Sequence, residues 1–277
     1  MTKEVVLNYF ENNKGEILSG AELAEKLGVT RTAIWKAINT LREDGYDIES
    51  IKKKGYRLNV NSDILSTIKI QGSLEDDKYD LRVFKTIDST NKLAKVAAIT
   101  EDKEWIVIAS EEQEQGKGRG QKHFSSPNGK GVYMSIILRP YVEIKDRKLL
   151  MYLSAVAVIE AIRDITGIQA TVKSPNEIMY QNNKLGGILS EAILELETER
   201  IEALIIGIGL NVYGTKENFD NQSNDINTSI GEVIGKYCNR SELIASILNY
   251  MDKYYEVFKV TPEMISENWC KYKEMKE

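Results

Sequence analysis

Apolar residues recur at helical spacing through the first part of the chain. The spacing predicts helices over residues 5–10, 21–27 and 31–43. The last of these buries apolar side chains three and four positions apart, namely Ile34, Ala37, Ile38 and Leu41. Ser19 and Thr30 stand where N-cap side chains are needed, and Gly28 ends the middle helix. Two short helices joined by a glycine turn indicate a helix-turn-helix, whose second helix enters the major groove of DNA.

An alternating pattern then replaces the helical one. Residues 46–51 and 55–58 read as two strands of a hairpin with a basic turn. A basic hairpin after a helix-turn-helix resembles the wing of a winged helix. Side chains from the hairpin contact phosphates in such a module, and those of the second helix contact bases or backbone. The residues expected at DNA are Lys52, Lys53, Lys54 and Arg57 in the hairpin, with Thr30, Arg31, Thr32 and Lys36 at the helix. The alternative is a winged helix used only for packing or protein contacts.

A polar stretch over residues 59–67 separates two regions of different pattern. We therefore expect a winged helix-turn-helix DNA-binding domain over residues 1–62 and a second domain over residues 63–277. The second region predicts strands over residues 81–85, 105–109, 132–138, 170–173, 177–180, 184–196 and 200–211. It also predicts helices over residues 92–99, 147–166 and 241–258. Strands mixed with hairpins and few helices favour an α+β domain around one mixed sheet.

Composition and charge narrow the function classes. The net charge is −5, but residues 1–60 carry 10 basic and 9 acidic side chains, so the acidic excess lies in the remainder. Any DNA contact should therefore come from a local patch of the N-terminal region. Cys238 and Cys270 lack the spacing of zinc ligands, and the single histidine, His123, has no nucleophile elbow upstream. No apolar run approaches a membrane span or a signal peptide, which predicts a cytoplasmic protein.

A glycine-rich, cationic stretch stands between two strand-like runs of the second region. Residues 113–124 read QEQGKGRGQKHF, so Lys117 and Arg119 alternate with glycines. Glycine allows positive φ and close approach of the backbone to a ligand, and the cations suit an oxyanion or phosphate. The stretch lacks both the Walker spacing and the dinucleotide fingerprint. Taken alone, it predicts a mobile loop that binds an anion, with a solvated surface turn as the alternative.

Three further polar motifs lie in the second region, one before the glycine-rich stretch and two after it. They are Ser89-Thr90-Asn91, Lys173-Ser174-Pro175-Asn176-Glu177 and Lys184-Leu185-Gly186-Gly187. Each has a purely structural explanation. The first is a helix cap, the second is a turn, and the third is a solvated lysine beside a β-bulge.

The order of these motifs resembles that of one protein family. The SGAELAEKLGVTRTAIWKAINTLREDGYDIES and KGYRL segments, followed by DSTN, GKGR, KSPNE, KLGGIL and IGIGLNV, are similar to the bifunctional biotin–protein ligases that double as biotin-operon repressors. The similarity runs from about residue 5 to about residue 270. It implies a biotin/lipoate-ligase-like catalytic domain behind the winged helix. That domain would form biotinyl-5′-AMP from biotin and ATP with Mg²⁺, and pass biotin to a lysine of a carboxyl-carrier domain.

The resemblance also implies a role for each motif residue. Biotin would be bound by Ser89, Thr90, Asn91, Gln113, Gly116, Lys117, Arg119, Lys184, Gly187 and Gly209. The nucleotide would be bound by Lys117, Arg119, His123, Asn176 and Asn211. The catalytic residues would be Arg119, Lys184 and Glu177, and no protein metal site is expected. Operator DNA would be a partner, and the liganded protein would be a homodimer because paired modules read two-fold half-sites.

Three departures from the family pattern leave a second function open. The loop carries Lys117 for the family's first arginine, Gln121 for its last and His123 for its tryptophan. The KSPNE motif has Ser174 for a tryptophan and Glu177 for an aspartate, which moves the carboxylate outward by one methylene. The chain also stops soon after Trp269, where the family usually adds a small β-barrel. The alternative is a repressor that senses biotin or its adenylate and ligates poorly. A regulator that senses an unrelated acyl group is a third possibility.

Overall fold

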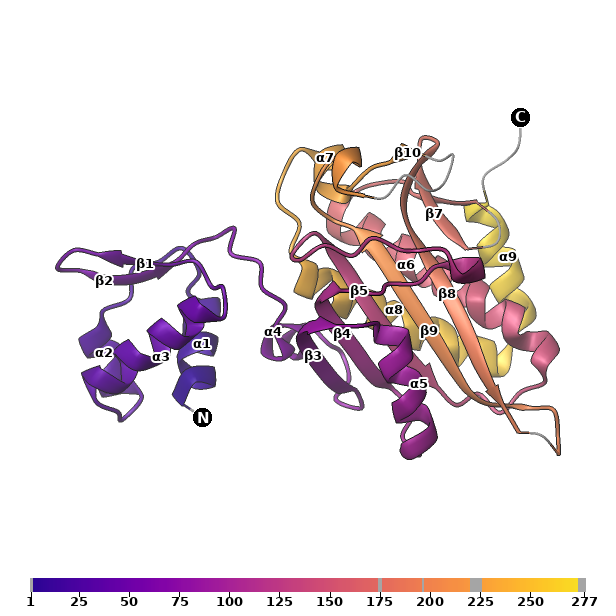
Figure 1. Cartoon of the computed structure of the whole chain (residues 1–277), viewed down its shortest axis with the longest axis horizontal. Helices are drawn as coiled ribbons and strands as arrows, with labels where there is room; N and C mark the ends of the chain where they lie inside the picture. The colour runs from indigo at the N-terminus through magenta and orange to yellow at the C-terminus, as the bar shows by residue number, and fades with distance from the viewer. Residues whose placement is uncertain (1, 174–175, 196, 220–225, 274–277) are drawn as a thin grey trace. The chain divides into compact units, whose positions relative to one another are not determined.

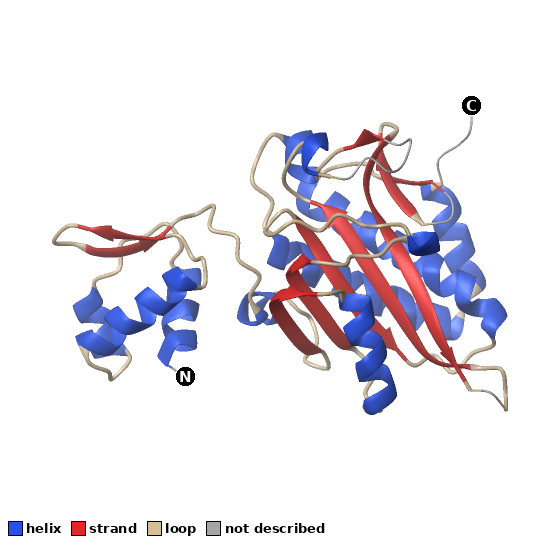
Figure 2. Ribbon diagram, in the orientation of Figure 1, coloured by secondary structure: helices blue, strands red, loops and turns tan. Residues whose placement is uncertain are grey.

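The N-terminal residues form three helices and a hairpin around a small apolar core. The protein is described by a computed structural model, which covers residues 2–173, 176–195, 197–219 and 226–273 (Figures 1 and 2). The elements are α1 (Thr2–Asn12), α2 (Gly20–Lys26), α3 (Arg31–Glu43), β1 (Ile48–Ile51) and β2 (Gly55–Leu58). The core holds Phe10, Leu23, Ile34, Ile38, Leu41 and Leu58, so the predicted apolar face of α3 is confirmed.

Both predicted helix caps of this region are confirmed. The Ser19 hydroxyl accepts from the Glu22 N–H, and the Thr30 hydroxyl accepts from the Ala33 N–H at 3.1 Å. These bonds satisfy backbone donors that a helix leaves unpaired in its first turn. They fix where α3 begins, and with it the face that the helix presents.

The chain divides into two compact units, Met1–Lys69 and Ile70–Glu277. The unit boundary falls inside a short helix, α4 (Thr67–Gly72), that the sequence pattern does not predict. Within the first unit, Lys69 forms a buried ion pair with Glu11 of α1 at 2.8 Å. The segment expected as a linker is thus partly held against the winged helix. The functional limits of residues 1–62 and 63–277 stay a prediction.

A mixed sheet organises the second unit. Its strands run in the order β3-β4-β5-β9-β8-β7-β6, and β10 pairs with β8. They are β3 (Asp80–Ile87), β4 (Ile106–Gln113), β5 (Gly131–Leu138), β6 (Thr171–Lys173), β7 (Glu177–Tyr180), β8 (Asn183–Leu194), β9 (Ile201–Asn211) and β10 (Ile226–Asn227). The β3–β4 and β8–β10 pairs are parallel, and the other pairs are antiparallel. The predicted α+β domain with a mixed sheet is confirmed.

Helices cover the two faces of the sheet unequally. The helices are α5 (Thr90–Thr100), α6 (Arg147–Thr166), α7 (Ile230–Ile234), α8 (Arg240–Val260) and α9 (Glu263–Tyr272). Figure 1 shows α6, α8 and α9 behind the sheet and α5 in front of it. Helix α6 is buried along most of its length, which explains why its sequence is apolar all round. The front face beside α5 is left for other segments to cover.

Two further helices and one helix cap differ from what the sequence predicts. Helices α7 and α9 are not predicted, because α7 has only five residues and α9 depends on the stacking of Trp269 on Tyr152 at 4.0 Å. Ser89 occupies the N-cap position of α5, but its side chain makes no capping hydrogen bond. The interpretation of Ser89-Thr90-Asn91 as a simple cap is therefore wrong.

Candidate active site

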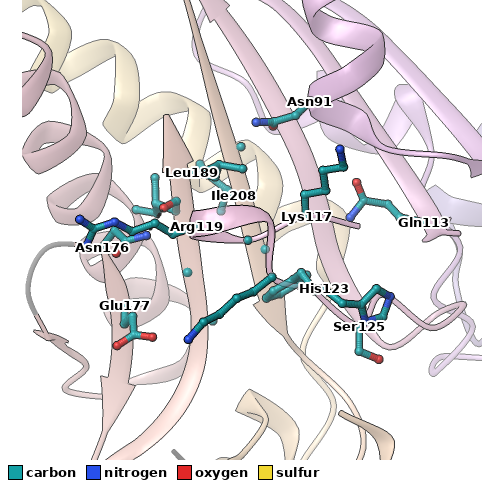
Figure 3. Close-up of a pocket in the computed structure, with 18 of the residues that line it drawn as sticks. Asn91, Gln113, Lys117, Arg119, His123, Ser125, Asn176, Glu177, Leu189 and Ile208 are labelled. Carbon is teal, nitrogen blue, oxygen red and sulfur yellow. Dashed lines mark hydrogen bonds between the residues drawn. The ribbon is translucent and has the colours of Figure 1, made fainter. Parts of the chain in front are cut away.

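A cavity of about 650 Å³ opens on the front face of the sheet in the second unit (Figure 3). The N-terminal turn of α5, the glycine-rich loop and strands β7, β8 and β9 enclose it. Its lining contains a polar wall, a floor of glycines and a group of cations. These three parts come from separate stretches of the sequence.

The floor of the cavity is backbone, because glycines alternate along the central strands. Gly207 and Gly209 lie on one face of β9, and Gly187 of the neighbouring strand β8 pairs with Gly209. A methyl group at Gly209 would lie 2.5 Å from the Phe124 ring, and one at Gly207 would lie 2.1 Å from Asn91 Oδ1. Because these two positions have no side chain, Phe124 and Asn91 can pack directly against the sheet.

The polar wall is a set of hydrogen-bonded side chains at the start of α5. The Thr90 N–H and hydroxyl reach Gln113 Oε1 at 2.8 Å and 3.1 Å. The amide of Gln113 donates to the Ser126 hydroxyl at 2.9 Å. Ser89, Thr90 and Asn91 are buried, at 5%, 3% and 7% exposure. These groups are held in fixed orientations at an enclosed surface, which suits recognition of a small polar ring.

The glycine-rich loop folds back on itself as a narrow ribbon. Lys117 and His123 face each other as a β-bridge, and Gly118 N–H donates to the Lys122 carbonyl at 2.8 Å. Of the three glycines only Gly120, at the tip, has positive φ, at 68°. A methyl group at Gly116 would lie 2.3 Å from the Phe124 carbonyl, so this glycine is needed for close packing. The loop is hydrogen-bonded rather than an open turn.

An ion pair stands at the other end of the cavity. Lys184 Nζ lies 2.6 Å from Glu177 Oε1, and the two side chains are 19% and 25% exposed. Lys184 is the second residue of β8, and its pairing and low exposure show that it is not a solvated strand end. The register between β7 and β8 shifts beside Leu185, which supports the predicted bulge next to Gly186. Ser174 and Pro175 of the KSPNE motif lie outside the described residues.

The cavity is cationic although the region after residue 60 is acidic overall. Among its described lining residues, the cations are Lys117, Arg119, Lys122 and Lys184, and the one carboxylate is Glu177. Such a surface attracts anions, and the attraction is strongest where water is excluded. No cluster of three His, Cys, Asp or Glu suited to a metal occurs in the described part of the chain. Glu177 and the amide of Asn176 are the oxygen donors near the cations, which suits Mg²⁺ carried in by phosphates.

Fourteen of the sequence-derived assignments can now be placed. All the residues expected to bind biotin or nucleotide or to act in catalysis line the cavity, except one; those that line it are Ser89, Thr90, Asn91, Gln113, Lys117, Arg119, His123, Asn176, Glu177, Lys184, Gly187, Gly209 and Asn211. Gly116 is the exception, since it is buried behind the Phe124 backbone and does not line the cavity. The individual roles of the lining residues stay predictions.

Several lining or supporting residues escape the sequence analysis. They are Phe124, Met134, Ser126, Ser135, Glu191, Phe219 and Asn227. Phe124 packs edge-on against Tyr133 at 6.4 Å. Burial raises the pKa of the Tyr133 hydroxyl, which donates to the Pro127 carbonyl at 3.1 Å. Every residue of β5 is buried, so Ser135 lies among buried apolar residues. A lone serine in such an apolar run is the sequence signal that could have indicated a polar role for it.

The residues expected at DNA lie on exposed surfaces of the first unit. Arg31, Thr32 and Lys36 are exposed on α3, and Lys52, Lys53 and Lys54 are exposed at the turn of the hairpin. The Thr30 hydroxyl is used as a cap, and Arg57 pairs with Glu49 at 2.7 Å. Trp35 also lies exposed on α3, at 53%. An exposed basic helix and wing are the surfaces that a winged helix presents to a duplex.

Two family models match the chain. One described as HTH domain matches residues 2–57, and one described as Biotin/lipoate A/B protein ligase family matches residues 83–211. With the winged helix and the glycine-floored, cationic cavity, these matches define the class of protein. It is a helix-turn-helix protein with a biotin/lipoate ligase domain.

Named relatives extend the match along most of the chain. The "Bifunctional ligase/repressor BirA" of Bacillus subtilis (strain 168) is 34% identical over 252 residues, which cover 90% of this chain and 77% of that protein. The protein of the same name from Escherichia coli (strain K12) is 34% identical over 198 residues, covering 72% and 60%. The chain therefore belongs to the biotin/lipoate A/B protein ligase family and, within it, to the bifunctional ligase/repressors.

Solved structures share the fold of the second unit. Biotin protein ligase from Aquifex aeolicus in complex with biotin and ATP has a TM-score of 0.59 at 24% identity, covering 70% of this chain and 78% of that chain. The enzyme from Leishmania major in complex with biotinyl-5-AMP has a TM-score of 0.61 at 20% identity, covering 72% and 83%. At these identities the likeness shows the fold alone.

No helix of the described residues is long and apolar enough to cross a membrane.

Proposed function

We propose that this chain is a biotin–protein ligase and a biotin-responsive transcriptional repressor. The observation that carries the proposal is the cavity itself. It joins a fixed polar wall, a flat glycine floor and four cations beside one carboxylate among its described residues. A bicyclic urea fits the first two parts, and a carboxylate meeting an α-phosphate requires the third. The family membership of the chain supports the same reading.

The reaction brings two anions together before either can react. The biotin carboxylate attacks the α-phosphate of ATP, the bond to the bridging oxygen breaks, and pyrophosphate leaves with its electron pair. Cations at the site lower the repulsion and stabilise the charge that develops on the phosphoryl oxygens. We assign this work to Arg119 and Lys184. Glu177 and Asn176 would hold the Mg²⁺ that accompanies ATP, and the ion would supply positive charge to the pyrophosphate oxygens.

The second step transfers biotin to a carrier domain. A neutral lysine amine of the carrier attacks the acyl carbon of the adenylate, AMP leaves, and an amide forms. The amine must lose a proton, and we assign its acceptance to Glu177, the one carboxylate among the described lining residues. Its ion pair with Lys184 at 2.6 Å means that both groups are ordered before substrate arrives. The ribbon that carries Lys117 and Arg119 would shield the adenylate from water.

One assay separates the two candidate functions. The protein is incubated with biotin, MgATP and a carrier domain, and pyrophosphate release is scored separately from biotin transfer. Release followed by transfer supports the ligase. Biotin binding or adenylate formation without transfer leaves a sensor that represses without efficient ligation. The sensor remains a candidate because the sequence departs from the family pattern in the loop, at Lys117, Gln121 and His123, and at Ser174. No binding of biotin, with or without nucleotide, refutes both.

Two substitutions test the assigned cations. Lys184→Ala and Arg119→Gly should each speed adenylate release by at least tenfold, because each removes a cation from the phosphate region. The first unit should stay folded, since both residues lie in the second. Lys145→Ala is the matched control, because Lys145 is 72% exposed and pairs with the surface carboxylate of Glu143 at 2.7 Å. Equal off-rates in all four proteins would refute the assignment.

The DNA-binding half of the proposal depends on the first unit. We propose that α3 and the basic hairpin bind an operator, and that biotin with ATP drives formation of a homodimer that reads two half-sites. Because both ATP and DNA are involved, we place the protein in the cytoplasm. Sedimentation with saturating biotin, MgATP and operator DNA tests the dimer. A protein that remains monomeric under these conditions refutes it.

A further inference from the structure

A chain of buried polar groups runs behind the polar wall of the cavity. Asn91 Nδ2 donates to Glu191 Oε2 at 2.8 Å, and Asn91 Oδ1 lies 2.6 Å from the Ser135 hydroxyl. Ser135 is also 2.8 Å from the Thr90 hydroxyl, which lies 3.1 Å from Gln113 Oε1. Asn91 and Gln113 both line the cavity (Figure 3). The chain therefore connects Glu191 to the groups that meet a ligand.

The orientation of the Asn91 amide follows from the first member of this chain. An ionised carboxylate can only accept hydrogen bonds, so the amide nitrogen of Asn91 must face Glu191 and its oxygen must face Ser135. That oxygen can also only accept, so Ser135 donates to it. Thr90 has one hydroxyl proton, and two acceptors lie within reach of it, the Ser135 oxygen at 2.8 Å and Gln113 Oε1 at 3.1 Å.

The result is a fixed pattern of donors and acceptors at the cavity surface. The Thr90 hydroxyl proton goes to one of its two protein neighbours, so the Thr90 oxygen is left as an acceptor. The second Nδ2 proton of Asn91 is left as a donor. The Thr90 backbone N–H holds Gln113 Oε1 at 2.8 Å, so Gln113 presents its amide nitrogen towards Ser126 and the cavity. A cyclic urea has the complementary pattern, with N–H donors and one strong acceptor oxygen.

We propose that Glu191 is a positioning residue that fixes the Asn91 amide with its nitrogen as a donor, and so selects a cyclic urea, whose oxygen accepts, over isosteres that carry an N–H in place of that oxygen. The inference rests on the proposed function for its ligand, but not for the proton directions. Glu191 lies 100 residues from Asn91 in sequence and does not line the cavity. It acts only through Asn91, whose side chain lies over Gly207 where a methyl group would clash at 2.1 Å.

A lysine contacts the other oxygen of the same carboxylate. Lys95 Nζ lies 2.5 Å from Glu191 Oε1. The two side chains are 45% and 28% exposed, so Lys95 faces water while Glu191 reaches inwards. Removing Lys95 leaves the hydrogen bond between Asn91 and Glu191 in place, whereas changing Glu191 to an amide removes the constraint that orients Asn91.

The decisive variant is Glu191→Gln, because it keeps the shape and removes the acceptor-only property. A glutamine can donate to Asn91 Oδ1, which allows the Asn91 amide to turn and the hydroxyl protons to reverse. Biotin affinity should fall about 10- to 100-fold, the range for losing a hydrogen bond to a charged group. For 2-iminobiotin, in which an N–H replaces the urea oxygen, the fall should be smaller. The ratio of biotin affinity to 2-iminobiotin affinity should therefore fall about tenfold.

Two further variants separate positioning from simple loss of structure. Glu191→Asp keeps an acceptor, so it should weaken both ligands but preserve their ratio. Lys95→Gln should change biotin affinity by less than about threefold, because exposed pairs contribute little. Calorimetry supplies the affinities, and tryptophan emission confirms that each variant is folded. An unchanged biotin to iminobiotin ratio in a folded Glu191→Gln protein overturns the proposal.

A measurement without ligand keeps this result separate from the proposed function. The side-chain amide of Asn91 is observed by ¹⁵N NMR and assigned by its absence in Asn91→Asp. In the wild type its protons should exchange slowly with solvent, and Glu191→Gln should speed exchange and move the resonances. Identical spectra would refute the assigned proton directions. If the spectra change but the wild type binds no biotin, the proton directions stand and the proposed ligand falls.

Discussion

Replacing Arg240 should destabilise the second unit more than any other single change of a charged residue considered in this structure. Arg240 is the first residue of α8 and is 0% exposed. Its guanidinium lies 2.7 Å from Glu111 Oε2 on β4 and donates to the Gly131 carbonyl at 3.2 Å, where β5 begins. The pair therefore ties a helix behind the sheet to the two strands that flank the glycine-rich loop.

The magnitude follows from what Arg240→Met leaves behind. Glu111 is 7% exposed on its side chain, so its carboxylate would be left in a site with little water. Breaking a buried pair in this way costs about 3–5 kcal/mol. In a unit of about 200 residues this lowers Tm by about 6–20 °C. Replacing both partners, as in Glu111→Leu with Arg240→Met, should recover at least half of the loss, because no buried charge remains.

Urea unfolding followed by tryptophan emission measures this effect in the right unit. Trp105 and Trp269 are buried in the second unit, so their emission shifts when that unit opens. Lys259→Met is the matched control, since Lys259 is 46% exposed and pairs with Glu256 on the surface. It should change the free energy of unfolding by about 0.5 kcal/mol or less. A loss below about 1 kcal/mol for Arg240→Met, or no recovery in the double variant, would show that the ion pair does not carry the stability assigned to it.

Three further outcomes are expected. Gly209→Ala should weaken biotin binding about tenfold or more, because the new methyl lies 2.5 Å from the Phe124 ring; calorimetry checks this against Gly72→Ala, which meets nothing within 4 Å. Of the three tryptophans, all of them in the described residues, Trp35 is the exposed one. Operator DNA should therefore quench its emission, and Trp35→Phe should lower the affinity for operator DNA by about tenfold. Unaltered emission on binding would place the duplex elsewhere. Arg82 lowers the pKa of both its carboxylate partners in the folded state, so the stability that they contribute is present at neutral pH and is lost as pH falls through those lowered values. The Tm difference between wild type and Arg82→Met should therefore shrink between pH 6 and pH 3, and a constant difference would count against the pairing.

Local pattern was sufficient for the elements whose stability is local. Helix α3 was predicted at the residues where it occurs, because four apolar positions share one face and Thr30 caps its first turn. Strands β5 and β9 were predicted to within a residue, since their runs of apolar residues are long and bounded by polar stretches. Strand β4 was predicted to end at residue 109, four residues too early, because its last residues, Ser110–Gln113, are polar. Helix α9 was missed because its apolar face is short and gains its stability from stacking on α6.

The candidate site divides in the same way. Motif order alone brought together the residues of the glycine-rich loop, the start of α5 and the Lys184 turn. Gly116 does not line the cavity, and its need for glycine comes from the Phe124 backbone behind the wall. At Ser89 motif order indicated a residue that does line the cavity, whereas the local pattern indicated a cap although the side chain makes no capping bond.

The amino-acid order by itself determined the winged helix, the strands of the mixed sheet and the cationic character of one loop, because each depends on residues a few positions apart. Only the tertiary structure decided that Glu191 meets Asn91, that Arg240 meets Glu111 and that glycines of two strands form one floor. These contacts join residues that are far apart along the chain. Their geometry is set by strand register and helix packing, which no local periodicity encodes.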